Sequence, residues 1–251
     1  MAASNVSRET LQFREWVEAC APGRMVFFGG AGVSTESGIP DFRSADGLYA
    51  QKYGDVPPEQ MISRSYFDAH PDEFFRFYFD RMIAREAKPN RAHLKLAQLE
   101  EEGTLSAVIT QNIDGLHQAA GSKTVYELHG TVLANHCMKC NAGYNLDQIT
   151  DLHEQAEDGV PRCPKCGGIV KPDVVLYEEG LDGRLLEASV NAIARADLLV
   201  IAGTSLAVYP AAGLIDYFSG DHLVIINLAP TPRDRFADLV VAEKVGQVFD
   251  F

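Results

Sequence analysis

The chain has 251 residues, a length that suits one large domain or one domain with a small insertion. Hydrophobic residues make up 46% of it, enough for an ordinary core, and the net charge of -13 at pH 7 repels the phosphate backbone of nucleic acids. The sequence shows no signal peptide and no run of about 18 apolar residues. We therefore expect a cytoplasmic protein that binds neither nucleic acid nor a membrane, and we expect it to be a monomer.

Four unbroken apolar runs predict strands that are covered on both faces. They are residues 25–28 (MVFF), 105–109 (LSAVI), 198–202 (LLVIA) and 222–227 (HLVIIN). Helical patterns lie between them, so we expect an α/β fold with a doubly wound parallel sheet. A polar or glycine-rich loop follows each run: GGAGVS, TQNID, GTS and LAP. The loops after parallel strands emerge at one edge of the sheet, so these four should converge on one crevice.

Two segments depart from this pattern. Residues 45–89 contain the aromatic stretch FFRFYFDRMI, which we expect to be helical and to end before KPN. Between Gly130 and Lys171 the sequence is acidic, carries cysteines and is poor in long apolar runs. This second segment cannot form a large core of its own, which predicts a small insertion held together by metal.

Four of the five cysteines form two C-x-x-C pairs, Cys137 with Cys140 and Cys163 with Cys166. Four thiolates fill a tetrahedral zinc site and leave no open position, so the metal should be structural. The alternative is a pair of redox dithiols. The turns CMKC and CPKCGG are typical of zinc knuckles and favour the metal.

The first loop contains Gly29, Gly30 and Gly32, which allow a pyrophosphate to approach the backbone closely. No GK[ST] sequence follows, so the loop is not a P-loop. Arg43 could neutralise a phosphate or serve as a surface ion-pair residue.

Two further polar clusters are TQNIDGLH and YELHGT. Asn112 and Asp114 offer an amide and a carboxylate that can bind a ribose or a carboxamide. His129 lies between an apolar strand and a glycine, where a general base would be placed, although a lone histidine is more often structural. We expect the histidines at positions 93, 117 and 222 to be helix or strand-end residues.

Together these motifs resemble those of the sirtuins, the NAD-dependent protein lysine deacylases. The stretches GAGVSTESGIPDFRS, TQNIDGLH, ELHGT, GTSLAVYP and VIINL, with the paired C-x-x-C, cover nearly the whole chain. The resemblance implies a discontinuous Rossmann-like NAD-binding domain formed by residues 1–44, 90–130 and 171–251. It also implies a smaller domain made of a helical module, residues 45–89, and a zinc-binding module, residues 131–170. NAD and an acyl-lysine peptide would meet in the cleft between them.

The resemblance also implies roles for individual residues. His129 would be the base that activates a ribose hydroxyl, and Asn112 would order the ribose and a water molecule. The peptide would pair with KPDVVLYEE as an added strand, where Val174, Val175 and Tyr177 would contact the acyl-lysine. The residues implied to bind NAD are Ala31, Gly32, Ser34, Thr35, Phe42, Arg43, Gln111, Ile113, Asp114, Gly203, Thr204, Ser205, Asn227 and Gln247.

We expect deacetylation, with several alternatives left open. The spacing of Tyr78 and Arg81 is that of desuccinylase members of the family. A mono-ADP-ribosyltransferase could use the same site, whereas a non-catalytic zinc-module binding protein is disfavoured because residues 141–161 carry acids and no Lys or Arg. A dehydrogenase lacks support because G-x-G-x-x-G is absent. Leu176 and Glu178 replace an aromatic residue and a glycine of the commoner family pattern, which tilts the expected preference towards basic peptides.

Overall fold

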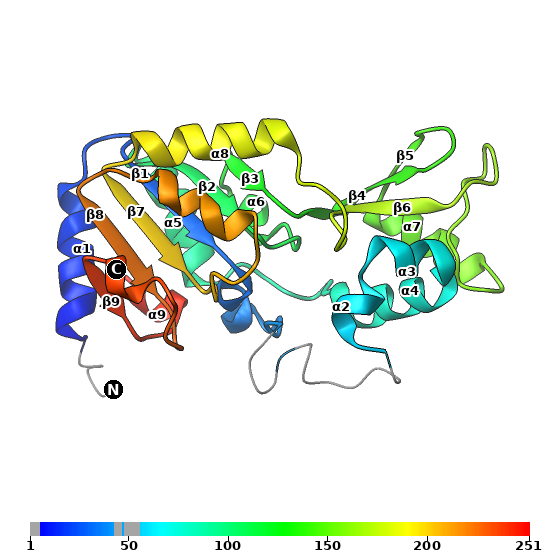
Figure 1. Ribbon diagram of the computed structural model, residues 1–251, viewed down its shortest axis with the longest axis horizontal. Helices are drawn as coiled ribbons and strands as arrows, with labels where there is room; N and C mark the ends of the chain where they lie inside the picture. The colour runs from blue at the N-terminus through cyan, green and yellow to red at the C-terminus, as the bar shows by residue number, and fades with distance from the viewer. Residues whose placement is uncertain (1–5, 43–46, 48–55) are drawn as a thin grey trace.

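The larger part of the molecule is built on a parallel sheet. The computed structural model describes residues 6–42, 47 and 56–251, and within them six strands follow the order β3-β2-β1-β7-β8-β9 (Figure 1). The strands are β1 (Met25–Gly29), β2 (Leu105–Thr110), β3 (Val125–Glu127), β7 (Leu198–Ala202), β8 (His222–Ile226) and β9 (Leu239–Val241). The chain order of the strands reverses between β1 and β7, which are neighbours. This order is that of the Rossmann fold, whose ligand crevice lies at such a switch point.

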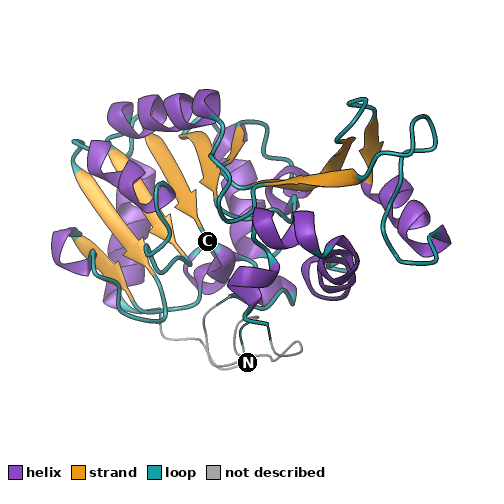
Figure 2. Ribbon diagram, turned by 45° about the vertical axis from the view of Figure 1, so that its right-hand side comes forward, coloured by secondary structure: helices purple, strands orange, loops and turns teal. Residues whose placement is uncertain are grey.

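Helices cover both faces of this sheet, as Figure 2 shows. Phe27 of β1 packs in one core cluster with residues of α1, α5 and α9, whereas Phe28 packs in the opposite cluster with residues of α8 and η5. Successive strand residues face opposite sides, so an unbroken apolar run serves both cores. The helices of this domain are α1 (Arg8–Ala19), α5 (Arg91–Glu101), α6 (Leu116–Ala120), α8 (Gly183–Arg195), α9 (Val245–Val248) and the 3-10 helices η5 (Ala211–Tyr217) and η6 (Asp234–Phe236).

Side-chain contacts fix two of these helices. Asn90 begins α5 with a capping box in which its side chain accepts from the backbone of His93. The Asn90 amide also donates to the carbonyl of Val33, at 2.7 Å, and so joins α5 to the loop after β1. On α1, the ring of Trp16 stacks on that of His222 with centroids 4.0 Å apart.

The smaller domain combines a three-stranded antiparallel sheet with short helices. The sheet order is β5-β4-β6, and the elements are β4 (Gly130–Cys137), β5 (Gly143–Asn145), α7 (Leu146–Gln155) and β6 (Val170–Val174). Beside it lie α2 (Pro58–Met61), α3 (Arg64–Ala69), α4 (Pro71–Phe77) and the π-helix η4 (Tyr78–Met82). Phe74 and Phe75 of α4 belong to the same core cluster as Val132 and Val170. The helical and zinc-binding modules therefore share one core.

The predicted fold class is confirmed, with a doubly wound parallel sheet and a smaller domain. The four predicted strands are β1, β2, β7 and β8, whereas the three-residue strands β3 and β9 were not predicted. The exact domain limits stay a prediction. We propose to extend the zinc-binding module to Val174, because β6 pairs with β4 up to that residue. In the described part of the chain, every helix is too short or too polar to cross a membrane.

Candidate active site

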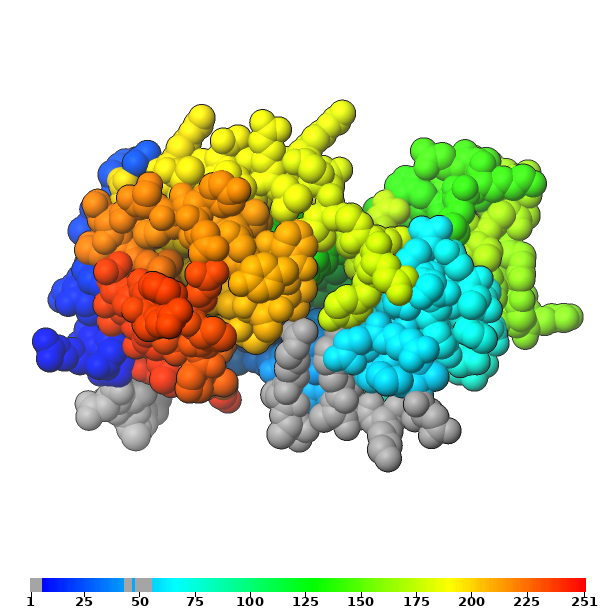
Figure 3. Space-filling view, viewed as in Figure 1, coloured from blue at the N-terminus to red at the C-terminus, as the bar shows by residue number. Residues whose placement is uncertain are grey.

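The loops after β1, β2, β7 and β8 line one cavity of about 540 Å³, as their common position at the sheet edge predicts. Figure 3 shows the segment after β6, in yellow-green, between the large domain and the cyan helical module. Most residues implied to bind NAD or peptide, and both implied catalytic residues, line this cavity. They are Ala31, Gly32, Ser34, Thr35, Phe42, Gln111, Asn112, Ile113, Asp114, His129, Val174, Val175, Tyr177, Gly203, Thr204, Ser205 and Asn227.

Glycines let the loops after β1 and β7 lie against each other. The amide of Gly32 donates to the carbonyl of Gly203 at 2.8 Å. A Cβ on Gly32 would lie 2.7 Å from the Cα of Gly203, and one on Gly30 would lie 2.7 Å from the Cβ of Thr204. The loop then continues through two 3-10 turns, η1 (Ala31–Val33) and η2 (Thr35–Ser37). The amides of Gly30, Gly32, Val33 and Ser34 are bonded to carbonyls of these loops and strands, which fixes the shape of the cavity wall here.

A network of side-chain hydrogen bonds joins three of the loops. Ser34 Oγ donates to Asp114 Oδ2 at 2.7 Å, and Asn112 Nδ2 donates to Ser34 Oγ at 3.0 Å. Gln111 Nε2 donates to Thr204 Oγ1 at 3.1 Å, which links the loops after β2 and β7. Ser34, Asn112 and Thr204 are all buried. The cavity wall therefore holds fixed donors and acceptors of the kind that recognise a ribose and a carboxamide.

His129 has the protonation state of a general base. Its Nδ1 lies 3.0 Å from the carbonyl oxygen of Gln111, and since a carbonyl only accepts, Nδ1 carries the proton. Nε2 is then left with a lone pair. Burial lowers the pKa of His129 below its ordinary value, although the hydrogen bond to Gln111 acts in the opposite direction. The imidazole is therefore neutral at pH 7 and can take up a proton.

The chain crosses closely behind His129. Its carbonyl accepts from the amide of Val175 at 2.9 Å. The next residue, Gly130, has φ 76°, and a Cβ there would overlap the carbonyl oxygen of Asp173. A glycine is therefore required for β6 to place Val174 and Val175 beside the histidine.

Tyr177 lines the cavity, but its main chain is already paired. Its amide donates to the carbonyl of Ile62 at 3.1 Å, and its carbonyl accepts from the amide of Arg64 at 3.0 Å. These bonds join the segment after β6 to the helical module. A peptide that adds as a strand would therefore pair with other main-chain positions of KPDVVLYEE.

Two residues implied to bind NAD are not placed in the cavity. Arg43 lies outside the described residues, and Gln247 of α9 is exposed and does not line the cavity in the described part of the chain. Glu243 and Lys244, which line it, were not predicted. They follow β9, a strand too short to leave a recognisable pattern, and Gln247 was the one residue after it that the resemblance implied.

Tyr78 and Arg81 lie differently with respect to the cavity. Arg81 lines it, whereas Tyr78 is fully buried among the aromatic residues of the small domain. Burial raises the pKa of Tyr78 above its ordinary value, and its hydroxyl has no hydrogen-bond partner among the described residues. The π-helical turn thus separates two side chains whose spacing suggested a joint carboxylate-binding role.

The four cysteines of the zinc-binding module form one cluster. Their Sγ atoms all lie within 4.8 Å of one another, with 3.4 Å between Cys137 and Cys166 and 3.6 Å between Cys140 and Cys163. Thiolates around one tetrahedral zinc lie about 3.8 Å apart, given a Zn–S distance of about 2.3 Å. The Tyr144 hydroxyl donates to Cys163 Sγ at 3.0 Å and lowers the pKa of that thiol to about 6. The donor set therefore fits one structural zinc ion.

The model of the Sir2 family matches residues 30–210. The chain belongs to this family. It is 56% identical over 227 residues to an NAD-dependent protein deacetylase of Clostridium acetobutylicum, an alignment that covers 90% of this chain and 91% of that protein. The predicted membership of the sirtuins is thereby confirmed.

Solved structures of Sir2 proteins agree with the fold. A Sir2 variant with a deacetylated p53 peptide and 3′-O-acetyl-ADP-ribose is 39% identical and superposes with a TM-score of 0.87, covering 96% of this chain and 95% of that one. A Sir2 protein with a p53 peptide and NAD+ is 40% identical, with a TM-score of 0.82 and coverage of 95% and 94%. The Sir2 family fold thus extends over almost the full chain.

Proposed function

We propose that the protein is an NAD-dependent protein deacetylase that acts on acyl-lysine peptides and proteins. The observation that carries the proposal is His129, a half-buried neutral imidazole in the wall of the cavity that the strand-end loops form. The curated relative at 56% identity is named for this activity, and the similar structures hold peptide with NAD+ or with an acetylated ADP-ribose.

The loop residues that line the cavity fit NAD, which when bound supplies the ribose carbon that nicotinamide leaves and the hydroxyl that receives the acyl group. We assign NAD binding to the residues named from the resemblance, with Gln247 and Arg43 retained only as predictions. Phe42 would shield the reactive ribose from water, because it lines the cavity. Ser34, Asn112 and Asp114 would hold the ribose through the network they already form.

His129 would take a proton from the ribose hydroxyl at Nε2. Its Nδ1 proton is held by Gln111, and this bond keeps the ring in the required tautomer. The fixed ring and the lowered pKa together make a base that is ready at neutral pH. Asn112 would order the same ribose; it is buried, and its Nδ2 donates to Ser34 Oγ at 3.0 Å.

The acyl-lysine would enter beside Val174, Val175 and Tyr177, which line the same cavity. We propose an acetyl group as the preferred acyl chain. Of Tyr78 and Arg81, only Arg81 lines the cavity, whereas Tyr78 is buried in the small-domain core. The carboxylate of a succinyl chain would therefore lack Tyr78 as a binding partner. Basic peptides suit the acidic molecule, and we propose that it works as a cytoplasmic monomer that does not bind nucleic acid.

The test is an incubation of the protein with NAD and a matched pair of acetyl-lysine and succinyl-lysine peptides, read by mass spectrometry. We expect free lysine, nicotinamide and an O-acetyl-ADP-ribose from the acetyl peptide, and at least about a hundredfold slower formation of these products by the His129→Ala variant. Faster loss of succinyl would reverse the proposed acyl preference. ADP-ribose left on the protein would identify a transferase instead, and intact NAD with every peptide would refute the proposal.

A further inference from the structure

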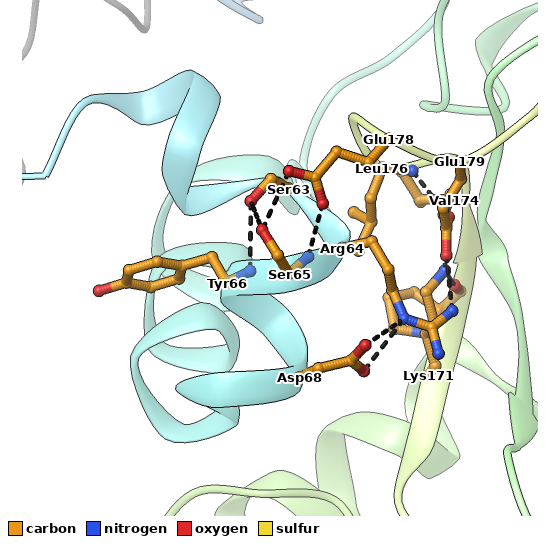
Figure 4. A network of polar contacts seen from close by, with 11 residues as sticks. Ser63, Arg64, Ser65, Tyr66, Asp68, Lys171, Val174, Leu176, Glu178 and Glu179 are labelled. Carbon is orange, nitrogen blue, oxygen red and sulfur yellow. Dashed lines mark hydrogen bonds and ion pairs between the residues drawn. The ribbon is translucent and has the colours of Figure 1, made fainter.

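Two consecutive acids, Glu178 and Glu179, hold the segment after β6 against the helical module (Figure 4). Val175 and Tyr177 of this segment line the cavity, and so do the two acids themselves. The contacts of Glu178 are with the first turn of α3, and those of Glu179 are with β6 and Arg64. The cavity wall is thus attached at this point to two different parts of the small domain.

Glu178 has a backbone conformation that normally favours glycine. Its φ is 76°, where a side chain with a Cβ is disfavoured. Both carboxylate oxygens are nevertheless engaged by one residue: Oε2 accepts from the amide of Ser65 at 2.9 Å and Oε1 accepts from its hydroxyl at 3.0 Å. We call this pair the Glu178–Ser65 clamp. The unfavourable backbone conformation thus comes with an anchoring contact that a glycine could not make.

The neighbouring contacts stiffen the same segment from both sides of the clamp. Before it, the main chain of Tyr177 pairs with Ile62 and Arg64. After it, Glu179 accepts from the amide of Leu176 at 2.9 Å, from Arg64 Nη1 at 3.0 Å and from Lys171 Nζ at 3.2 Å. The side chain of Leu176 is buried in the small-domain core. The segment therefore moves only if the first turn of α3 moves with it.

We propose that Glu178 is a positioning residue for the acyl-lysine peptide, acting through the Glu178–Ser65 clamp to fix the cavity wall at residues 175–177 against α3. The inference rests on the proposed deacetylase function. Glu178 acts on the peptide through the wall it holds, so its loss should weaken peptide binding. The NAD-binding loops lie on other elements. The His129 main chain contacts Val175, but its ring is held by Gln111, so kcat and NAD binding should change little.

The sharpest test is Glu178→Gly, because glycine suits the backbone conformation, so the anchor is removed without adding backbone strain. We expect the peptide KM to rise about tenfold, the factor that corresponds to loss of one hydrogen bond to a charged group, with kcat and the KM for NAD within about twofold of wild type. Glu178→Gln, which keeps an acceptor for the Ser65 amide, should restore most of the peptide affinity. Glu187→Ala, which removes an exposed acid of α8 away from the cavity, is the control for net charge.

Hydrogen exchange provides a readout that does not depend on activity. In Glu178→Gly, the amides of residues 175–179 and 62–65 should exchange about ten times faster, since local opening follows the lost contact. Should this variant fail to fold, Ser65→Ala is measured in the same way; it removes the hydroxyl, which contacts Glu178 and Ser63, and keeps the amide contact to Glu178.

An unchanged peptide KM in Glu178→Gly, or a lower kcat at constant KM, would overturn the proposal. Failure of Glu178→Gln to restore affinity would also count against it. If the wild-type protein deacetylates no peptide, the proposed function is wrong, and exchange alone decides the clamp: equal rates in wild type and Glu178→Gly would refute it.

Discussion

Two buried histidines behind the active site should make the protein sensitive to mild acid. His93 of α5 and His117 of α6 are 0% and 1% exposed, and their ring centroids lie 4.7 Å apart. Burial lowers the pKa of His93 to about 4 and that of His117 to about 3, from an ordinary value of 6.5. Within the described residues, neither ring nitrogen of His117 has a hydrogen-bond partner. The folded protein therefore resists protonation at both rings.

The sign and size of the effect follow from linkage. Well above pH 6.5 both rings are neutral in the folded and the unfolded chain, so they do not affect the free energy of unfolding. Below it the unfolded chain binds protons first, and stability falls until the pH reaches the folded values of about 4 and about 3. Between pH 7 and pH 5 each histidine should cost about 2 kcal/mol, and the pair about 4 kcal/mol.

Urea unfolding at pH 7 and pH 5, compared between wild type and His117→Leu, measures this. Leucine has a similar volume and forfeits no hydrogen bond at this position. The variant should lose about 2 kcal/mol less than wild type between the two pH values, because one titrating group has gone. An equal loss in both proteins would refute the reasoning, since other groups would then carry the acid sensitivity.

Three further predictions concern the site and its supports. His129→Ala should lower kcat/KM by about 10² to 10⁴, while calorimetry shows unchanged NAD binding. In the wild type, activity should rise with pH and reach half its maximum below pH 6.5, because burial lowers the pKa of His129; a half-maximum above pH 7 would contradict this. Removing zinc by chelation, or by Cys163→Ser, should abolish deacetylation and the amide protection of β4 to β6, and protection that survives a measured zinc release would argue against a structural metal. Gly130→Ala should destabilise the protein by about 3 kcal/mol or more in thermal unfolding, through its positive φ and the overlap with Asp173, and a change below about 1 kcal/mol would show that the crossing is less tight.

The sequence predicted the parts of the fold that carry a strong periodic signal. Strands β1, β2, β7 and β8 are central in the sheet and buried on both faces, so their apolar runs are unbroken. Strands β3 and β9 lie at its edges and have three residues each, of which Val125 and Leu239 are only half-buried. The sequence pattern of so short and exposed a strand cannot be distinguished from that of a loop.

The candidate site was predicted as a group of motifs and less well as individual contacts. Convergence of the loops follows from parallel topology, so the cavity around Ser34, Asn112 and Thr204 could be expected. The burial of Tyr78 depends on a π-helical turn, and the pairing of Tyr177 depends on how the helical module packs. Both are set by tertiary contacts between segments far apart in the chain, which a motif does not encode.

The stacking of Trp16 on His222 gives the molecule an optical reporter in one domain only. The chain contains one tryptophan, which lies on α1 against the parallel sheet. The small domain contains tyrosine and phenylalanine but no tryptophan. Indole emission therefore follows the melting of the large domain. Cobalt substituted at the four cysteines would follow the other domain through its visible thiolate absorption. Measurements at two wavelengths in one sample thus show whether the two domains unfold together or one after the other.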